Sequence, residues 1–283
     1  MKRYLKRLSL ISCILVLIII SILAVKRQAI LSHSWKVPSQ VHILFMGASH
    51  IMNSIDDSMM QEAINWASSS ERYMFTCIKL ERLLEANPQI DTIYLELAAT
   101  DIWEDTDYKY HVLNEQSHFV KYYWPFFNSE QWMLYKNEPM QVAGLIVSSI
   151  GSFKEFTQKG WWKKMGGYDG KDAVIDPDKK SVLPYVVPGS GHQINYDYLR
   201  RIIKLCKEKG VKLYFIETPV YHIEDIYDTA YFYNVYRQAF SDVEFLDYSN
   251  WPIPMDERAD GSHLNKRGAR RFTRFLMNQH RMK

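Results

Sequence analysis

Apolar and polar residues follow one another along the chain in a way that predicts one long apolar helix, followed by strands separated by helices. The apolar helix covers residues 8–25, which carry no charge and approach the ~20 residues that a membrane-crossing helix needs. Short apolar runs predict strands at residues 41–46, 92–97, 211–217 and 243–247. Helical periodicity predicts helices at residues 72–86, 194–209, 231–240 and 266–282. Because strands separated by helices usually form parallel sheets covered on both faces, we expect an α/β fold.

The apolar segment is either an export signal or a permanent membrane anchor, and its details favour the anchor. It exceeds the usual signal-peptide core of about 7–15 residues, and residues 25–28 offer no small-x-small cleavage site. Residues 10–13 resemble a lipoprotein box, but most of the apolar run follows Cys13, which makes lipidation the weaker interpretation. Four basic residues precede the segment and two follow it closely, so we expect a cytoplasmic N-terminus. The expected protein is single-pass in the inner or plasma membrane, with its main domain periplasmic or extracellular.

The formal charge of +3 is unevenly distributed along the chain. The first 27 residues hold six Lys or Arg and no acid, which leaves −3 for the remainder. The basic character therefore belongs to the membrane flank and argues against a nucleic-acid partner. Cys77 and Cys206 fall in predicted helices, where burial as small hydrophobic residues is the simpler interpretation and a disulfide stays open. The sequence has no Cys/His zinc spacing, and we expect neither a metal nor a cofactor.

Three segments follow from these patterns. Residues 1–27 form a cytoplasmic stub and signal anchor, residues 28–40 a polar linker, and residues 41–283 one domain. Residues 103–191 interrupt the alternation of strands and helices, and so long a stretch predicts a cap-like insertion. Its aromatic clusters at residues 122–127 and 161–162 suit burial best, with sugar binding and a membrane interface as alternatives. Residues 165–172 have turn chemistry whose spacing does not fit an EF-hand loop.

Candidate chemistry lies at the two ends of the predicted domain. Ser49 directly follows the first predicted strand, and Asp260 precedes His263 by three residues. An acid at this spacing can turn back onto the imidazole from one short loop, and the serine would complete a relay of the Ser-His-Asp type. Other interpretations stay open: Asp260 could cap the last helix while His263 simply packs, or the two could bind a metal.

Both blocks resemble those of the SGNH/GDSL hydrolase family. The family's Gly-Asp-Ser block corresponds to residues 47–49, and its Asp-x-x-His block to residues 260–263. The resemblance implies a flavodoxin-like, three-layer α/β/α fold with catalytic Ser49, Asp260 and His263. It places the second block at residues 65–70 and the third at residues 98–101, so oxyanion donors would be sought at Ser69, Ser70 and Thr100. The chain departs from the pattern there, with serine in place of glycine and threonine in place of asparagine, and Ala48 replaces the acid of the first block.

The resemblance is to the membrane-anchored, envelope-facing branch of the family. It implies a serine esterase or O-acyltransferase acting on ester-linked acyl groups, with acylated carbohydrate of the cell envelope as the expected substrate. The altered blocks support an alternative, a degenerate domain that binds glycan or a membrane-protein partner as an accessory in envelope assembly. A classical α/β-hydrolase fits less well, because residues 47–51 lack the second glycine of the nucleophile elbow.

Overall fold

The computed structural model describes residues 1–32, 34–103, 117–152, 165–176, 193–221 and 229–282. The chain forms two compact units. One consists of Met1–Ser34 and Tyr110–Trp161, and the other of Trp35–Lys109 and Trp162–Lys283. The second unit holds the sheet and the candidate catalytic residues.

A five-stranded sheet is the centre of the second unit. Its strands are β1 (Ile43–Met46), β2 (Ala63–Asn65), β3 (Thr92–Glu96), β4 (Lys212–Glu217) and β5 (Glu244–Asp247). All neighbouring strands pair in parallel, in the order β2-β1-β3-β4-β5. This is the strand order of flavodoxin-like folds, so the predicted parallel α/β architecture is confirmed. Every residue of β1 is buried, as expected of a strand covered on both faces.

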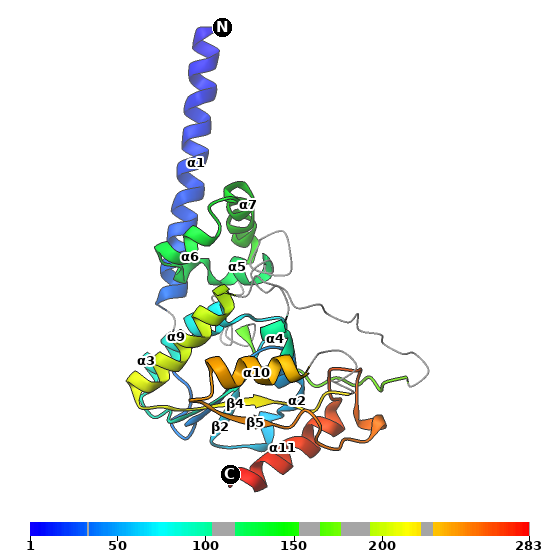
Figure 1. Cartoon of the computed structure of the whole chain (residues 1–283). Helices are drawn as coiled ribbons and strands as arrows, with labels where there is room; N and C mark the ends of the chain where they lie inside the picture. The colour runs from blue at the N-terminus through cyan, green and yellow to red at the C-terminus, as the bar shows by residue number, and fades with distance from the viewer. Residues whose placement is uncertain (33, 104–116, 153–164, 177–192, 222–228, 283) are drawn as a thin grey trace. The chain divides into compact units, whose positions relative to one another are not determined.

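Helices cover the sheet on both faces (Figure 1). The helices are α2 (Ser49–Ser54), α3 (Tyr73–Ala86), α4 (Ala99–Trp103), α9 (Gln193–Lys209), α10 (Thr229–Ala239) and α11 (Lys266–His280). In Figure 1, α3, α9 and α10 lie on one side of the strands and α11 on the other. Contacts between α3 and α9 and between α11 and α2 agree with this division.

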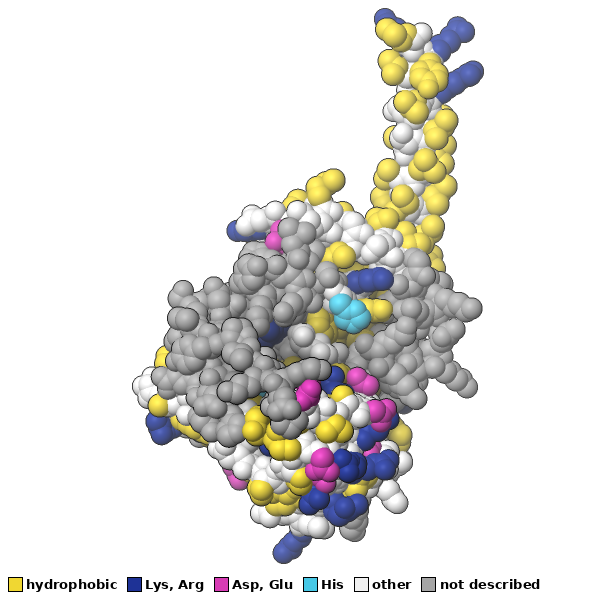
Figure 2. Space-filling view, turned by 90° about the vertical axis from the view of Figure 1, so that its right-hand side faces the viewer, with side chains coloured by type: hydrophobic (Ala, Val, Ile, Leu, Met, Phe, Trp, Pro, Cys, Tyr) yellow, Lys and Arg dark blue, Asp and Glu magenta, His cyan; other side chains and the backbone are white. Residues whose placement is uncertain are grey.

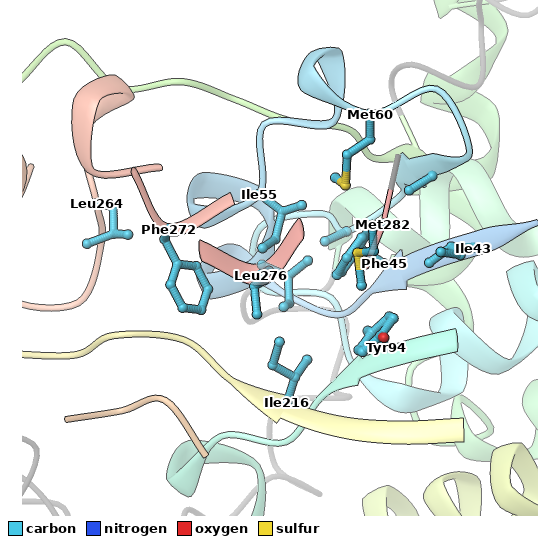
Figure 3. Packing of buried hydrophobic residues seen from close by; sticks show 13 residues of the cluster. Ile43, Phe45, Ile55, Met60, Tyr94, Ile216, Leu264, Phe272, Leu276 and Met282 are labelled. Atoms are coloured by element: carbon cyan, nitrogen blue, oxygen red, sulfur yellow. The ribbon is translucent and has the colours of Figure 1, made fainter. Parts of the chain in front are cut away.

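The main hydrophobic cluster lies between the sheet and α11. Phe45, Tyr94 and Ile216 point from three strands toward Phe272 and Leu276 of α11 (Figure 3). Phe45, Ile216 and Phe272 are fully buried, so this contact removes large apolar surfaces from water. The same cluster includes Ile51 and Ile55 at α2 and Leu264 beside the C-terminal loop. Hydrophobic packing therefore fixes both chain segments that carry the candidate catalytic residues.

The first unit combines the N-terminal helix with short helices from the middle of the chain. These are α1 (Lys2–Leu31), α5 (Ser117–Tyr123), η3 (Trp124–Phe126), α6 (Ser129–Leu134), α7 (Pro139–Ser148) and η4 (Ser149–Ser152). Helix α1, with 30 residues, is long and apolar enough to cross a membrane. A helix with these properties is either an anchor or a signal sequence.

Several elements differ from the sequence-based expectations. The four predicted strands and four predicted helices of the second unit are present with their ends moved by at most two residues. Strand β2 and helix α2 were not predicted. Cys77 and Cys206 are buried and free, so they form no disulfide. Tyr122, Tyr123 and Trp124 are buried, as favoured for the first aromatic cluster, while Trp161 and Trp162 lie outside the described residues.

The predicted insertion does not fall within one unit. Residues 165–176 belong to the unit that holds the sheet, where Lys171 bridges to Asn265 and the Gly167 N–H donates to the Ala67 carbonyl at 2.9 Å. Residues 165–172 therefore run along the body of that unit instead of forming an isolated turn. A cap-like role for residues 103–191 stays a prediction.

Candidate active site

Ser49 is the first residue of α2, immediately after the turn that leaves β1. Gly47 in that turn has φ +144°, and an added Cβ would lie 2.3 Å from Cβ of Glu96. Only glycine fits such a conformation and such a close approach. The turn therefore places Ser49 just past the carboxyl end of a central strand, where ligands bind in open parallel sheets.

His263 and Asp260 share one loop that leads into α11. The Ala259 N–H donates to the His263 carbonyl at 2.9 Å, and the N–H groups of Ser262 and His263 both donate to Asp260 Oδ1 at 2.9 Å. Asn265 caps α11 by accepting from two backbone N–H groups and donates to the Asp256 carbonyl at 2.8 Å. The loop is thus closed on itself and tied to the start of a buried helix.

The structure brings the three predicted catalytic residues together. Nε2 of His263 lies 2.9 Å from Oγ of Ser49, and Nδ1 of His263 lies 2.9 Å from both carboxylate oxygens of Asp260. Partial burial alone would raise the pKa of Asp260, but the hydrogen bonds from His263 and from the loop backbone outweigh it and lower the pKa. The carboxylate is therefore ionised near neutral pH and can fix the imidazole with Nε2 facing the serine. An arrangement of this kind can activate a serine, with the imidazole accepting the hydroxyl proton and the carboxylate orienting the ring.

A second histidine, His50, follows Ser49 directly in the sequence and contacts two acids, Glu217 and Glu96. His50 Nδ1 lies 2.9 Å from Oε1 of Glu217 and 3.9 Å from Oε1 of Glu96. The His50 ring stands edge-on to His263, with ring centroids 5.8 Å apart. Both acids are almost completely buried, and each is the last residue of its strand.

Glu96 also fixes the backbone of the turn at residues 47–51, which carries Ser49 and is called the nucleophile turn. Its Oε2 accepts the Ala48 N–H at 2.8 Å and the Ile51 N–H at 3.1 Å. The side chain from β3 thereby holds both ends of the segment that contains Ser49. Residue 48 is itself an alanine, so the acid that braces this turn comes from the neighbouring strand.

The charges of this buried group depend on one another. Burial alone would lower the pKa of His50, but the carboxylates of Glu217 and Glu96 outweigh it and raise the pKa to about 10. Burial raises the pKa of Glu96 to about 7, although the positive charge of His50 opposes this. Burial also raises the pKa of Glu217, while the charge of His50 and the hydrogen bond between the two side chains oppose that rise, so Glu217 and His50 stabilise each other's charged forms.

The expected oxyanion residues lie in two other turns. The Ser68 N–H donates to the Gly47 carbonyl at 3.0 Å, which sets the turn with Ser69 and Ser70 beside the nucleophile turn. Ser70 has φ +60°, a conformation that favours glycine. Thr100 lies in the first turn of α4 and is partly buried. No hydrogen bond joins Ser69, Ser70 or Thr100 to Ser49, and their role as oxyanion donors stays a prediction.

Asp101, next to Thr100, belongs to the scaffold. Its carboxylate accepts from the Ala98 N–H at 3.2 Å and from the Tyr73 hydroxyl at 3.1 Å, and it pairs with Arg72 at 3.4 Å. These contacts fix the start of α4 after β3. The third block is therefore held rigidly at the carboxyl end of the sheet, although it offers no amide side chain at residue 100.

Sequence reasoning did not single out Glu96, which falls inside the strand predicted at residues 92–97. Glu217, at the end of the strand predicted at residues 211–217, could be expected either to line the pocket or simply to belong to the turn after the strand. A signal was nevertheless available: Glu217 ends one predicted strand, Glu96 is the next-to-last residue of another, and parallel strands end at the same edge of the sheet. Two acids at that edge, together with the His that follows the serine, could have predicted a charged cluster below the nucleophile.

A protein-family model matches residues 189–282, which include β4, β5 and the Asp260–His263 loop. Comparison with curated proteins gives no match.

Three solved structures are similar to this chain over most of its length. A protein from Streptococcus pneumonia, provisionally described as a platelet activating factor, has 13% identity and a TM-score of 0.45, covering 97% of this chain and 98% of the other. A provisional acylhydrolase from Bacteroides fragilis has 13% identity and a TM-score of 0.38, with coverages of 84% and 85%. A GDSL-like lipase from Bacteroides thetaiotaomicron has 9% identity and a TM-score of 0.39, with coverages of 91% and 96%. Likenesses this distant carry no argument about activity or substrate, so the function is argued from the site itself.

Proposed function

We propose that this protein is a membrane-anchored serine esterase or O-acyltransferase of the SGNH type. The hydrogen-bonded series Ser49–His263–Asp260, with 2.9 Å at each contact, is the observation that carries the proposal. A serine hydroxyl is a weak nucleophile unless a base removes its proton, and the histidine is oriented for that role by the carboxylate on its far nitrogen.

The chemistry follows from these positions. Ser49 Oγ attacks the carbonyl carbon of an ester while His263 Nε2 takes the hydroxyl proton. The bond to the leaving oxygen then breaks, and His263 returns the proton to that oxygen, so an alcohol leaves and the acyl group stays on Ser49. Water or a second hydroxyl attacks the acyl-serine next, giving a free acid or a transferred ester. Asp260 remains ionised throughout and stabilises the imidazolium.

The negative charge that develops on the carbonyl oxygen needs donors aimed at it. Removing one such donor typically lowers turnover by about 100- to 1000-fold. We assign this role to the Ser49 backbone N–H, the backbone of Ser69 or Ser70 and the hydroxyl of Thr100. The Ser49 N–H has no hydrogen-bond partner among the described residues, which leaves it free for a substrate. The shorter hydroxyl of Thr100 suits a slower enzyme than an asparagine would.

The proposed substrate is an acyl ester of an envelope polysaccharide. This part rests on the family resemblance and on the N-terminal helix, which suits a domain held outside the membrane. A fold does not determine a substrate, so the class of substrate is tested separately from the chemistry.

Covalent labelling tests the reaction most directly. Purified full-length protein in detergent should react with a fluorophosphonate probe at Ser49, located by mass spectrometry. Ser49→Ala should abolish labelling, and His263→Ala should lower its rate by at least about 1000-fold, because triad residues act as a unit. Ser54→Ala is a matched control, since this buried serine on the same helix bonds to Thr218 and not to His263.

The opposite result would favour the accessory protein. If wild-type protein fails to label under conditions that label a known serine esterase, and Ser49→Ala retains full biological activity, the enzyme proposal fails. Hydrolysis of an acetylated polysaccharide, compared with a simple aryl ester, then separates the substrate class from the chemistry.

A further inference from the structure

An uncharged, exposed helix face accompanies the N-terminal helix in the first unit. In α7, Met140 is 81% exposed and Val147 is 43% exposed, and Ala143 and Gly144 between them are also exposed. These positions are spaced i, i+3, i+4 and i+7, so they form one face of the helix. Val142 points the other way and is buried. The whole of α7 contains no charged residue.

Helix α7 packs against the candidate membrane span. Helix α1 contacts η3, α7 and η4, and the buried Lys26 side chain donates to the Ser149 carbonyl directly after α7. Figure 1 shows α7 beside the half of α1 that leads into the rest of the chain. Lys26 follows the last residue of the apolar span, and its ammonium group donates to the carbonyl of Ser149, the first residue of η4. The end of α7 therefore lies at the same height along α1 as the end of the span.

Burial along α1 shows how far these contacts extend. Ile19, Leu23, Lys26 and Ile30 are partly or fully buried, while most other residues of α1 are exposed. Their spacing of four, three and four residues marks one stripe of the helix. From Lys26 to Ile19 this stripe rises by about 10 Å. If residues 8–25 cross the membrane, the segments that cover Ile19 and Leu23 lie at the depth of the outer hydrocarbon layer.

The chemistry around α7 fits that depth. Trp132 and Met133 of α6 are exposed, and Lys136 follows them with an exposed side chain. Aromatic residues with nearby lysines are typical of the membrane interface, where the ring meets the headgroups and the cation binds anionic lipid. In Figure 2 apolar side chains cover α1, with Lys and Arg at its free end. Exposed apolar faces of this kind mark contact sites on soluble proteins, but here the face adjoins the span.

We propose that the α6–α7 segment, led by the face of Met140, Ala143, Gly144 and Val147, is embedded in the outer lipid leaflet beside α1. The occupant of this face is lipid. The segment would enter the leaflet without crossing it, since α7 has 10 residues and a span needs about 20. The inference rests on the anchor part of the proposed function and is independent of the serine chemistry.

Site-specific fluorescence in lipid tests this assignment. Full-length protein carrying Cys13→Ser is reconstituted into phosphatidylcholine and phosphatidylglycerol vesicles and labelled with the polarity-sensitive dye NBD at Met140→Cys. The two remaining cysteines are buried. Leu15→Cys reports the span, and Lys204→Cys, on an exposed face of α9, reports water. Val147→Cys provides a second α7 position, and circular dichroism checks that each variant folds.

We expect blue-shifted emission at Met140 and Val147, and quenching by doxyl groups on the lipid chains at least half as strong as at Leu15. Lys204 should show neither. Quenching at Leu15 with water-like emission at both α7 positions would overturn the inference and leave the anchor intact. Blue-shifted emission without lipid quenching would show that protein covers the face, which also overturns it. Absence of quenching at Leu15 would refute the anchor itself, and with it this proposal.

Discussion

At the scale of single residues, the site separates two tasks between two histidines. His263 lies against Ser49 and has a partly exposed carboxylate behind it, which suits a group that gains and loses a proton in each cycle. His50 is held by Glu217 in a buried ion pair and suits a fixed charge. Glu96, 3.9 Å from His50, accepts two backbone N–H groups of the nucleophile turn. The buried pair therefore belongs to the scaffold of the turn rather than to the proton relay.

The His50 pair should make stability depend on pH. Its folded pKa of about 10 lies above the ordinary value of 6.5, so its stabilisation is complete below pH 6.5 and is lost as pH rises through 10. The titratable groups that face His50 are Glu217, Glu96, Asp101 and the ring of His263. We expect the melting temperature of the wild type to fall between pH 7 and pH 10, measured by differential scanning fluorimetry in detergent.

Variants separate this effect from general alkaline loss of stability. His50→Gln and Glu217→Gln should each lower the melting temperature at pH 7 and flatten its fall toward pH 10. His42→Gln serves as control, because His42 has an exposed side chain whose contacts are a 3.1 Å hydrogen bond with the Gln40 carbonyl and a 3.7 Å approach to Glu62. Equal slopes in the wild type and in His50→Gln would contradict the assignment of a charged, paired His50.

At the scale of elements, the sequence predicted those strands and helices that are long enough to show a pattern of apolar residues. Strands β3 and β4 are continuous apolar runs, and α9 and α11 repeat their apolar residues at helical spacing, so all four could be located from the sequence. Strand β2 has three residues and α2 has six, too few for a period to appear. Their positions depend on pairing with β1 and on packing against α11, which a single sequence does not display. The close approach of Gly47 to Glu96 is likewise a tertiary contact.

The element most responsible for the site is the N-terminus of α11. Asn265 caps this helix and also bonds to the Asp256 carbonyl, so it joins the helix to the loop that carries Asp260 and His263. Asn265→Ala should lower the free energy of unfolding by about 1–2 kcal/mol, as loss of an N-cap typically does. It should also slow fluorophosphonate labelling, because the loop loses its attachment.

Two controls accompany this change. Asn265→Ser keeps a cap acceptor and should lose less stability than the alanine variant. Asn128→Ala removes the capping box of α6, in the other unit, and should leave the labelling rate unchanged. Denaturant unfolding and labelling kinetics on the same samples give both readouts. Unchanged stability in Asn265→Ala would show that water replaces the cap at no cost.

At the scale of the whole molecule, the candidate membrane helix and the candidate catalytic residues belong to different units. The first contains α1 and the short helices around it, and the second contains the sheet with all residues of the proposed relay. Ser49 and His263 are 214 positions apart in sequence, yet the parallel sheet brings them to hydrogen-bonding distance. The resemblance in the two sequence blocks predicted that these residues meet, whereas the hydrogen bonds that Glu96 accepts from the turn backbone and the exposed, uncharged face of α7 became visible only in the structure.

The last prediction concerns the membrane orientation of the complete protein. The charge-free span and its basic N-terminal flank predict a cytoplasmic start and an external second unit. In intact cells stripped of their wall, external protease should therefore digest an epitope placed after the C-terminus, while washing at high salt should leave the protein attached. A cytoplasmic protein probed in the same sample controls for leakage.

Replacing Lys2, Arg3, Lys6 and Arg7 with Gln should produce a protected fraction, because the charge difference across the span then favours the opposite orientation. Recovery of a soluble mature form lacking roughly the first 25–30 residues, the length of an ordinary signal peptide, would show that α1 is removed and would overturn the anchor.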